Sequence, residues 1–138
     1  LGIPGLDFRR GLGDSRASDR GYSNRVNAEG LVELLHRLAE GRVVSRGASQ
    51  WLLASLFKQA VRSGIPHGLP PYVKHRARVA HKTGNISTVE HDAGLVYIPR
   101  RKPYALAVLT EWPGRGPYHA HCIARVTLAV HEAMVEGI

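Results

Sequence analysis

The residues best suited to chemistry form one run, His81-Lys82-Thr83-Gly84-Asn85, at the end of a predicted strand. Lys82 supplies a fixed positive charge, and the hydroxyl of Thr83 can donate a hydrogen bond. Gly84 has no Cβ, so a flat ligand can approach the strand closely. These residue types suit an anionic group beside a strand edge. A strand end that leads into a turn, with Lys82 solvated, is the structural alternative.

Two other short runs imitate known catalytic motifs. Ser55-Leu56-Phe57-Lys58 satisfies a Ser-x-x-Lys spacing, and a helix would place its serine and lysine on one face. Helical spacing makes such pairs common, so we interpret this run as part of a structural helix. Tyr22-Ser23-Asn24 imitates a Tyr-Ser-Asn motif, and we interpret it as a loop or capping sequence.

The histidines and the cysteine do not form a coherent set of metal ligands. His119 and His121 lie two positions apart on a predicted helix and should point to different sides. We expect His81 to be a structural or surface residue. Cys122 is the only cysteine, which excludes an intrachain disulfide and a cysteine-based zinc site, and we expect it to be buried. We therefore expect neither a metal nor a cofactor.

Three segments must position these residues: an irregular segment over 1–25, two helices within 26–64, and strands with a last helix within 65–138. Asn27 should cap a helix that runs to about Glu40, and Ser45 should cap a second helix that ends at residues 64–66. Inward-facing positions in the second helix should be Ala48, Leu52, Leu53, Leu56, Phe57 and Val61. The paired prolines of residues 68–71 predict an extended connector.

Strands are predicted at 78–83, 93–98 and 104–110, joined as an antiparallel meander. The second and third are apolar on both faces, so helices should cover both sides. After a break at residues 114–117, a last helix should run to about Glu136 and bury Ile123, Val126, Ala129, Val130 and Ala133. The fold class is therefore α/β (α+β), an antiparallel sheet flanked by helices. Three such strands should leave one edge and part of one face without partners.

Composition limits the classes of function. The 138 residues include 43% apolar residues, enough for a core, and no apolar run is long enough to span a bilayer. The formal net charge is +8, yet no nucleic-acid-binding motif accompanies it. Leu1 is not a translation start, and we expect the sequence to be a segment of a longer protein.

The order of these elements resembles the C-terminal half of class A β-lactamases, which belong to the penicillin-recognising serine hydrolases. The resemblance rests on Lys82-Thr83-Gly84 on a strand, a short loop, the apolar strand after His91, a turn and the strand from Tyr104. The helices before them also fit, as do residues 23–28, which resemble the segment after the family's omega loop. The likeness covers nearly the whole chain but only about half of the family's domain.

The resemblance implies roles for the Lys-Thr-Gly run. Lys82 would attract the carboxylate of a β-lactam or a D-alanyl peptide, and Thr83 would donate a hydrogen bond to the same carboxylate. Gly84 would let the ligand lie along the strand, and the backbone N–H of Asn85 would be one oxyanion-hole donor. The resemblance implies a secreted or periplasmic location, with no cofactor.

Two parts of the family's machinery differ here. A nucleophilic serine with a lysine one turn later, and a Ser-Asp-Asn loop, are expected upstream of Leu1, in the other half of the domain. Class A enzymes also use an omega-loop glutamate to activate the deacylating water, and residues 6–11 contain none. Three hypotheses stay open: part of an acyl-transfer enzyme, a catalytically inactive relic or binding module, and a basic nucleic-acid-associated protein.

Overall fold

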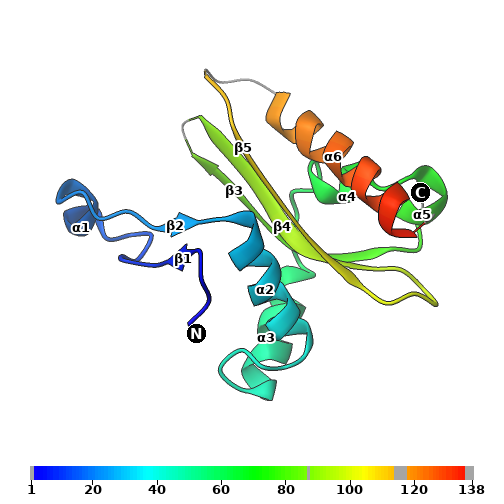
Figure 1. Cartoon of the computed structure of the whole chain (residues 1–138), viewed down its shortest axis with the longest axis horizontal. Helices are drawn as coiled ribbons and strands as arrows, with labels where there is room; N and C mark the ends of the chain where they lie inside the picture. Colours follow the sequence, from blue (N-terminus) through cyan, green and yellow to red (C-terminus); the bar gives the residue numbers. More distant parts are fainter. Residues whose placement is uncertain (1, 87, 114–117, 136–138) are drawn as a thin grey trace.

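A three-stranded antiparallel sheet carries helices on both faces in the computed structural model, which describes residues 2–86, 88–113 and 118–135 (Figure 1). The order of elements confirms the predicted helix, helix, three-strand meander and helix. Along the chain the elements are β1 (Leu6–Asp7), α1 (Ser15–Asp19), β2 (Arg25–Val26), α2 (Ala28–Ala39), α3 (Arg46–Leu56), α4 (Ile65–Gly68), α5 (Pro71–Lys74), β3 (Arg78–Ile86), β4 (Val89–Tyr97), β5 (Tyr104–Glu111) and α6 (Tyr118–Val135).

The main sheet has the strand order β3-β4-β5, with both pairs antiparallel. In its register Lys82 lies opposite Ala93, and Thr83 lies opposite Asp92. β3 is an edge strand among the described residues, so its outer side carries no strand partner. β3 and β4 extend further than predicted, because β3 continues through Lys-Thr-Gly to Ile86 and β4 already starts at Val89.

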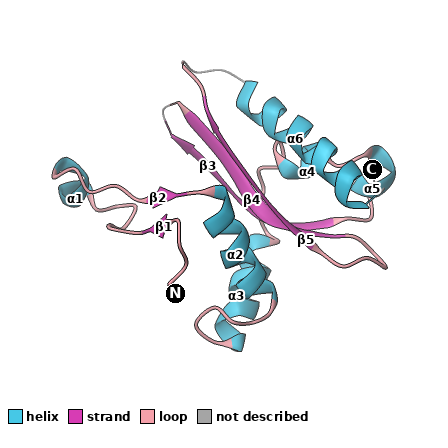
Figure 2. Cartoon of the chain, viewed as in Figure 1, coloured by secondary structure: helices cyan, strands magenta, loops and turns pink. Residues whose placement is uncertain are grey.

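The two faces of this sheet pack against different helices, as the apolar strands predicted. α2 and α3 contact one face, whereas α6, with α4 beside it, contacts the other (Figure 2). Because side chains alternate along a strand, consecutive residues of β3 belong to different faces. The α6 side holds the larger buried cluster, formed by Ile65, Leu69, Val79, Val96, Tyr104, Leu106, Val108 and Ile123. The α2 side holds a smaller one, formed by Leu35, Ala80 and Leu95.

The predicted helix starts are confirmed by their capping hydrogen bonds. The side chain of Asn27 accepts the Gly30 N–H at 2.8 Å, and the Ser45 hydroxyl accepts the Ala48 N–H at 3.1 Å. Such caps satisfy backbone donors that a helix leaves unpaired at its N-terminus. Local chemistry therefore fixes where α2 and α3 begin.

The predicted extent of the second helix is wrong. α3 ends at Leu56 with Phe57 as its C-cap, and Val61, expected to face inward, is 49% exposed. Of the other expected inward positions, Leu52 is 37% exposed, and the residue that α3 buries most deeply is instead Ser49. Ser49 is buried because its hydroxyl accepts the Val43 N–H and donates to the Val43 carbonyl. Periodicity does not show such a partner.

The predicted connector is extended only at its centre. Gly68 is the last residue of α4, and Pro71 is the first residue of α5. Leu69 and Pro70 between them are extended. Proline is tolerated in the first turn of a helix because its missing N–H has no intrahelical partner there, so Pro71 can start α5.

The face that α6 turns to the sheet matches the predicted one only in part: Ile123 is buried and Val130 is partly buried against the same cluster. Val126 is 38% exposed, and Ala129 and Ala133 are exposed as well. Two polar residues take the inward positions: Thr127 bonds the Ile123 carbonyl at 2.8 Å, and His131 bonds Tyr104. A prediction that assigns only apolar residues to the inward face of a helix overlooks such polar residues. The predicted break at residues 114–117 and the end at Glu136 lie outside the described residues.

The N-terminal segment forms a closed surface loop. β1 pairs with β2 antiparallel, and between them the Asn24 side chain accepts the N–H groups of Arg9 and Arg10 and donates to the Arg10 carbonyl. One amide therefore holds the two ends of the loop together. Within the described residues, no helix combines the length and the apolar character needed to cross a membrane.

Candidate active-site wall

The strand that carries Lys-Thr-Gly changes character halfway along its length. Val79, Ala80 and His81 are buried, with exposed fractions of 3% or less. From Lys82 onwards β3 is exposed, except that Thr83 is half-buried. The first half therefore anchors the strand between helices, and the second half presents the predicted site residues at an uncovered edge.

Lys82 lies on the face that α2 and α3 cover. It contributes to the lining of a cavity of about 220 Å³, together with Leu31, Leu34, Leu35, Leu38, Val43, Leu52, Leu56 and Ala93. Its Nζ donates to the carbonyl of Thr83 at 2.5 Å. Long lysine side chains commonly lay their methylene groups on apolar surface while the ammonium group stays polar. A cation thus lies at the rim of an apolar hollow.

Thr83 and Asn85 belong to the opposite face, because they alternate with Lys82 and Gly84. Thr83 lies opposite Asp92, and Asn85 lies opposite Glu90, in the β3–β4 register. The structure therefore brings the four predicted residues together along one strand edge, but on two faces of the sheet. A ligand that contacts Lys82 and Thr83 together has to lie across the edge itself.

His81, the buried residue beside Lys82, pairs with a buried aspartate that the sequence analysis did not identify. His81 Nδ1 lies 2.8 Å from Asp92 Oδ1, and both side chains are almost completely buried. The other carboxylate oxygen of Asp92 accepts the N–H of Ile65 at 2.9 Å. One aspartate therefore ties β4 to β3 and to the start of α4. An aspartate directly before the apolar run that starts at Ala93 was the signal that could have revealed it.

Glycines leave room for this pair. A Cβ on Gly64 would lie 2.4 Å from Asp92 Oδ2, and a Cβ on Gly94 would lie 2.5 Å from His81 Cβ. A Cβ on Gly84 would instead meet no atom within 4 Å. Packing therefore requires glycine at the first two positions, whereas Gly84 faces open space at the site.

Three further histidines have structural partners. His91 Nδ1 accepts the Thr110 N–H at 3.1 Å, and His119 Nδ1 lies 3.0 Å from the Thr110 hydroxyl. His131 Nδ1 lies 3.0 Å from the hydroxyl of Tyr104. His121 is exposed while His119 is buried, which confirms that they point to different sides. The described residues contain no group of three His, Cys, Asp or Glu side chains placed to hold a metal ion.

The two motif-like runs are used structurally. The Ser55 hydroxyl donates to the Trp51 carbonyl at 3.0 Å within α3, and Lys58 lies beyond the end of that helix. Asn24 closes the N-terminal loop. Neither observation points to a nucleophile.

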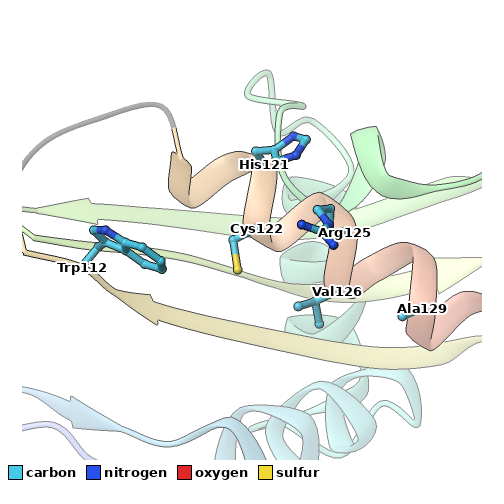
Figure 3. Close-up of a pocket in the computed structure, with 6 residues that line it drawn as sticks. All are labelled: Trp112, His121, Cys122, Arg125, Val126 and Ala129. Carbon is cyan, nitrogen blue, oxygen red and sulfur yellow. The ribbon is translucent and has the colours of Figure 1, made fainter.

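Cys122 is half-buried rather than buried, so that expectation was wrong. It borders a groove of about 460 Å³ between the end of β5 and the outward face of α6 (Figure 3). Trp112, His121, Arg125, Val126 and Ala129 complete its lining. The outward face of α6 thus borders an open groove.

Comparison with known proteins places this architecture in a family. The model of the beta-lactamase enzyme family matches residues 1–134. The chain belongs to the beta-lactamase enzyme family. No curated protein matches the sequence closely enough to count as a relative.

Solved structures show the same fold over about half of their length. PBP-A is 25% identical with a TM-score of 0.80, covering 98% of this chain and 48% of PBP-A. A beta-lactamase from Sphaerobacter thermophilus DSM 20745 is 23% identical with a TM-score of 0.78, covering 96% of this chain and 49% of that one. The TLA-1 extended-spectrum beta-lactamase is 21% identical with a TM-score of 0.82, covering 98% and 51%. The chain is the C-terminal half of this fold.

Proposed function

We propose that the Lys82–Asn85 edge of β3 is the substrate-binding wall of a serine acyl-transfer site that acts on β-lactams or D-alanyl peptides. The observation that carries the proposal is the exposed Lys-Thr-Gly edge, held in place by the buried His81–Asp92 pair directly before it. Family membership supports the reaction class. A mutant of PBP-A, 24% identical to this chain, is known as an acyl-enzyme complex with penicillin G.

In this proposal each wall residue binds one part of the substrate. The Lys82 ammonium group and the Thr83 hydroxyl bind the substrate carboxylate, as a charge-assisted hydrogen bond and a neutral one. Gly84 leaves the edge flat, consistent with the open space at its Cβ position. The Asn85 N–H donates to the carbonyl oxygen on which negative charge develops during acyl transfer.

The nucleophile belongs to the other half of the fold in this proposal. A serine hydroxyl there adds to the substrate carbonyl, and the carbon–nitrogen bond then breaks as the leaving nitrogen takes up a proton. That half, in the same or a separate chain, would be the partner that completes the domain. The absence of glutamate from residues 6–11 favours a long-lived acyl-enzyme over rapid hydrolysis.

The decisive experiment measures acylation by penicillin of this chain combined with the other half of its domain. Mass spectrometry should show one penicilloyl adduct, located outside residues 1–138. Lys82→Ala should slow acylation by on the order of 10²-fold, the size expected when one partner is removed from a charged hydrogen bond that the bound substrate would bury. Lys58→Ala is the matched control, because Lys58 is an exposed lysine beyond α3, and it should leave the rate unchanged.

Two outcomes would reject the proposal. An adduct on this chain alone would place the nucleophile within residues 1–138. A correctly folded complex that never acylates would favour the inactive relic or binding module.

A further inference from the structure

The positive charge of the chain gathers at the end of the sheet far from the proposed wall. Lys74, His75 and Arg76 follow one another at the end of α5, and residues 100–102 form the β4–β5 turn as Arg100-Arg101-Lys102. All six side chains are exposed, and we call this surface the basic end. Figure 1 shows α5 and that turn at the same end of the molecule.

No carboxylate of the described residues forms an ion pair with the basic end. The sequence has no Asp or Glu between Glu40 and Glu90, and none between Asp92 and Glu111. Lys74 and Arg101 instead donate to the carbonyls of His67 and Val135, which holds α5 and the turn in place.

The backbone of the β4–β5 turn is strained at Arg100, as it is at Val44 in another loop. The φ of Arg100 is 65°, in the left-handed region where glycine and asparagine are favoured. A non-glycine residue in this region is strained, and such strain collects at functional positions. An arginine therefore occupies the tip of the turn although a glycine would be less strained.

The basic end also has an apolar component. A cavity of about 360 Å³ joins α5 to the turn and is lined by Tyr72, Val73, Arg76, Ile98, Pro99 and Arg100. Tyr72 is 62% exposed at its edge. A lining that contains two arginines and several apolar residues suits a ligand with an anionic head and an apolar body. Tyrosine, with its apolar ring and polar tip, favours the headgroup level of membranes.

We propose that the basic end docks on the surface of a membrane that contains anionic phospholipids. Lipid phosphates would contact Arg76 and Arg100, and the tyrosine ring would lie among the headgroups. β3 starts at Arg78, two residues after Arg76 of the basic end. Lys82 is four residues further along the strand, so the wall begins roughly 13 Å from the start of β3. Docking at the basic end would therefore leave the wall at a distance from the lipid. This inference does not depend on acyl transfer.

The test is co-sedimentation of the full chain with vesicles of phosphatidylcholine, with and without phosphatidylglycerol. We expect binding only when phosphatidylglycerol is present, and loss of binding at high salt, because salt screens exposed charges. R100E, R101E and K102E together should abolish binding. R16E, R20E and R25E lower the net charge by the same amount at exposed positions at the other end of the molecule, and this variant should still bind.

A single substitution separates binding from folding. Arg100→Gly should raise or preserve the melting temperature, because it relieves the left-handed strain, yet weaken vesicle binding about fivefold, the effect of one basic residue near an anionic surface. Equal losses in the two triple variants would overturn the proposal, since they would reflect net charge alone. Tighter binding to duplex DNA than to phosphatidylglycerol vesicles at the same salt concentration would also overturn it, in favour of nucleic acid.

Discussion

The two faces of the β3-β4-β5 sheet are built on different principles. Towards α6, a large apolar cluster encloses two buried polar pairs, His81 with Asp92 and Tyr104 with His131. Towards α2 and α3, the buried cluster is small and wholly apolar, and a cavity of about 220 Å³ remains beside Lys82. One face thus fixes the strand by specific contacts, and the other leaves space where the proposed wall begins.

The difference shows how neighbouring residues of one strand can serve opposite purposes. His81 and Lys82 are adjacent, yet alternation sends one into the α6 core and the other to the α2 side. A hydrogen-bonded buried pair tolerates little displacement, because an unpaired charge in the core is costly. We infer that the α6 face positions the wall and the α2 face accommodates what the wall binds.

The largest expected effect comes from removing the carboxylate of the buried pair. Asp92→Ala would leave His81 and the Ile65 N–H without their acceptor, and should lower the free energy of unfolding by about 3–5 kcal/mol. Urea denaturation measures this change. Asp92→Asn keeps the shape and one acceptor oxygen, so it should cost less. A loss below about 1 kcal/mol for Asp92→Ala would show that the pair does not anchor β3.

Large-to-small substitutions compare the two apolar clusters directly. Ile123→Ala on the α6 side should lower the free energy of unfolding by about 2–5 kcal/mol, because Ile123 is 1% exposed in the larger cluster. Leu35→Ala should cost less than Ile123→Ala, because Leu35 already borders a cavity and loses fewer contacts. Chemical denaturation of both variants tests the order, and the reverse order would break the comparison.

Glycine-to-alanine substitutions at two positions distinguish a role in packing from a role in the proposed wall. Gly94→Ala should cost about 1–3 kcal/mol of stability, because its Cβ would lie 2.5 Å from His81 Cβ and 2.6 Å from the Ala80 carbonyl. Gly84→Ala should change stability by less than about 0.5 kcal/mol, because its Cβ meets nothing within 4 Å. Thermal unfolding compares the two. If Gly84 acts in substrate binding, its variant should still acylate more slowly.

The smallest expected effect on stability concerns Tyr104, and it should be seen only at alkaline pH. Burial raises the pKa of Tyr104 from its usual 10 to about 12. The folded state therefore holds this proton more tightly than the unfolded state, and stability should fall as the pH rises from about 10 to about 12. Burial raises the pKa of Tyr97 as well, so the measurement is the difference between wild type and Tyr104→Phe. An unchanged alkaline slope in this variant would contradict the expectation.

The predictions from sequence were most accurate where the signal was local. Asn27 and Ser45 mark the starts of α2 and α3, because a cap needs only its own side chain and the next turn of backbone. The three strands and the Lys-Thr-Gly position on the first of them also agree with the structure. Their alternation and turns lie within short stretches of sequence.

Predictions failed where a polar side chain is buried through its own hydrogen bond to nearby backbone. Val126 and Val61 were expected inside and are exposed, whereas Thr127 and Ser49 were overlooked and are buried. Each buried polar residue has a hydrogen-bond partner that periodicity cannot show. The end of α3 at Leu56 was missed for a related reason, since apolar spacing continues beyond the point where the backbone leaves the helix.

The sequence by itself determined the family, the order of elements and the residues of the proposed wall, because these depend on local patterns and short motifs. The tertiary structure decided that His81 pairs with Asp92, since the pair exists only in the register that sets Thr83 opposite Asp92. It also decided that a cavity lies beside Lys82 and that the basic residues of α5 and of the β4–β5 turn share one surface. Strand register and helix packing bring residues that are distant in sequence into contact. No short stretch of sequence determines these contacts.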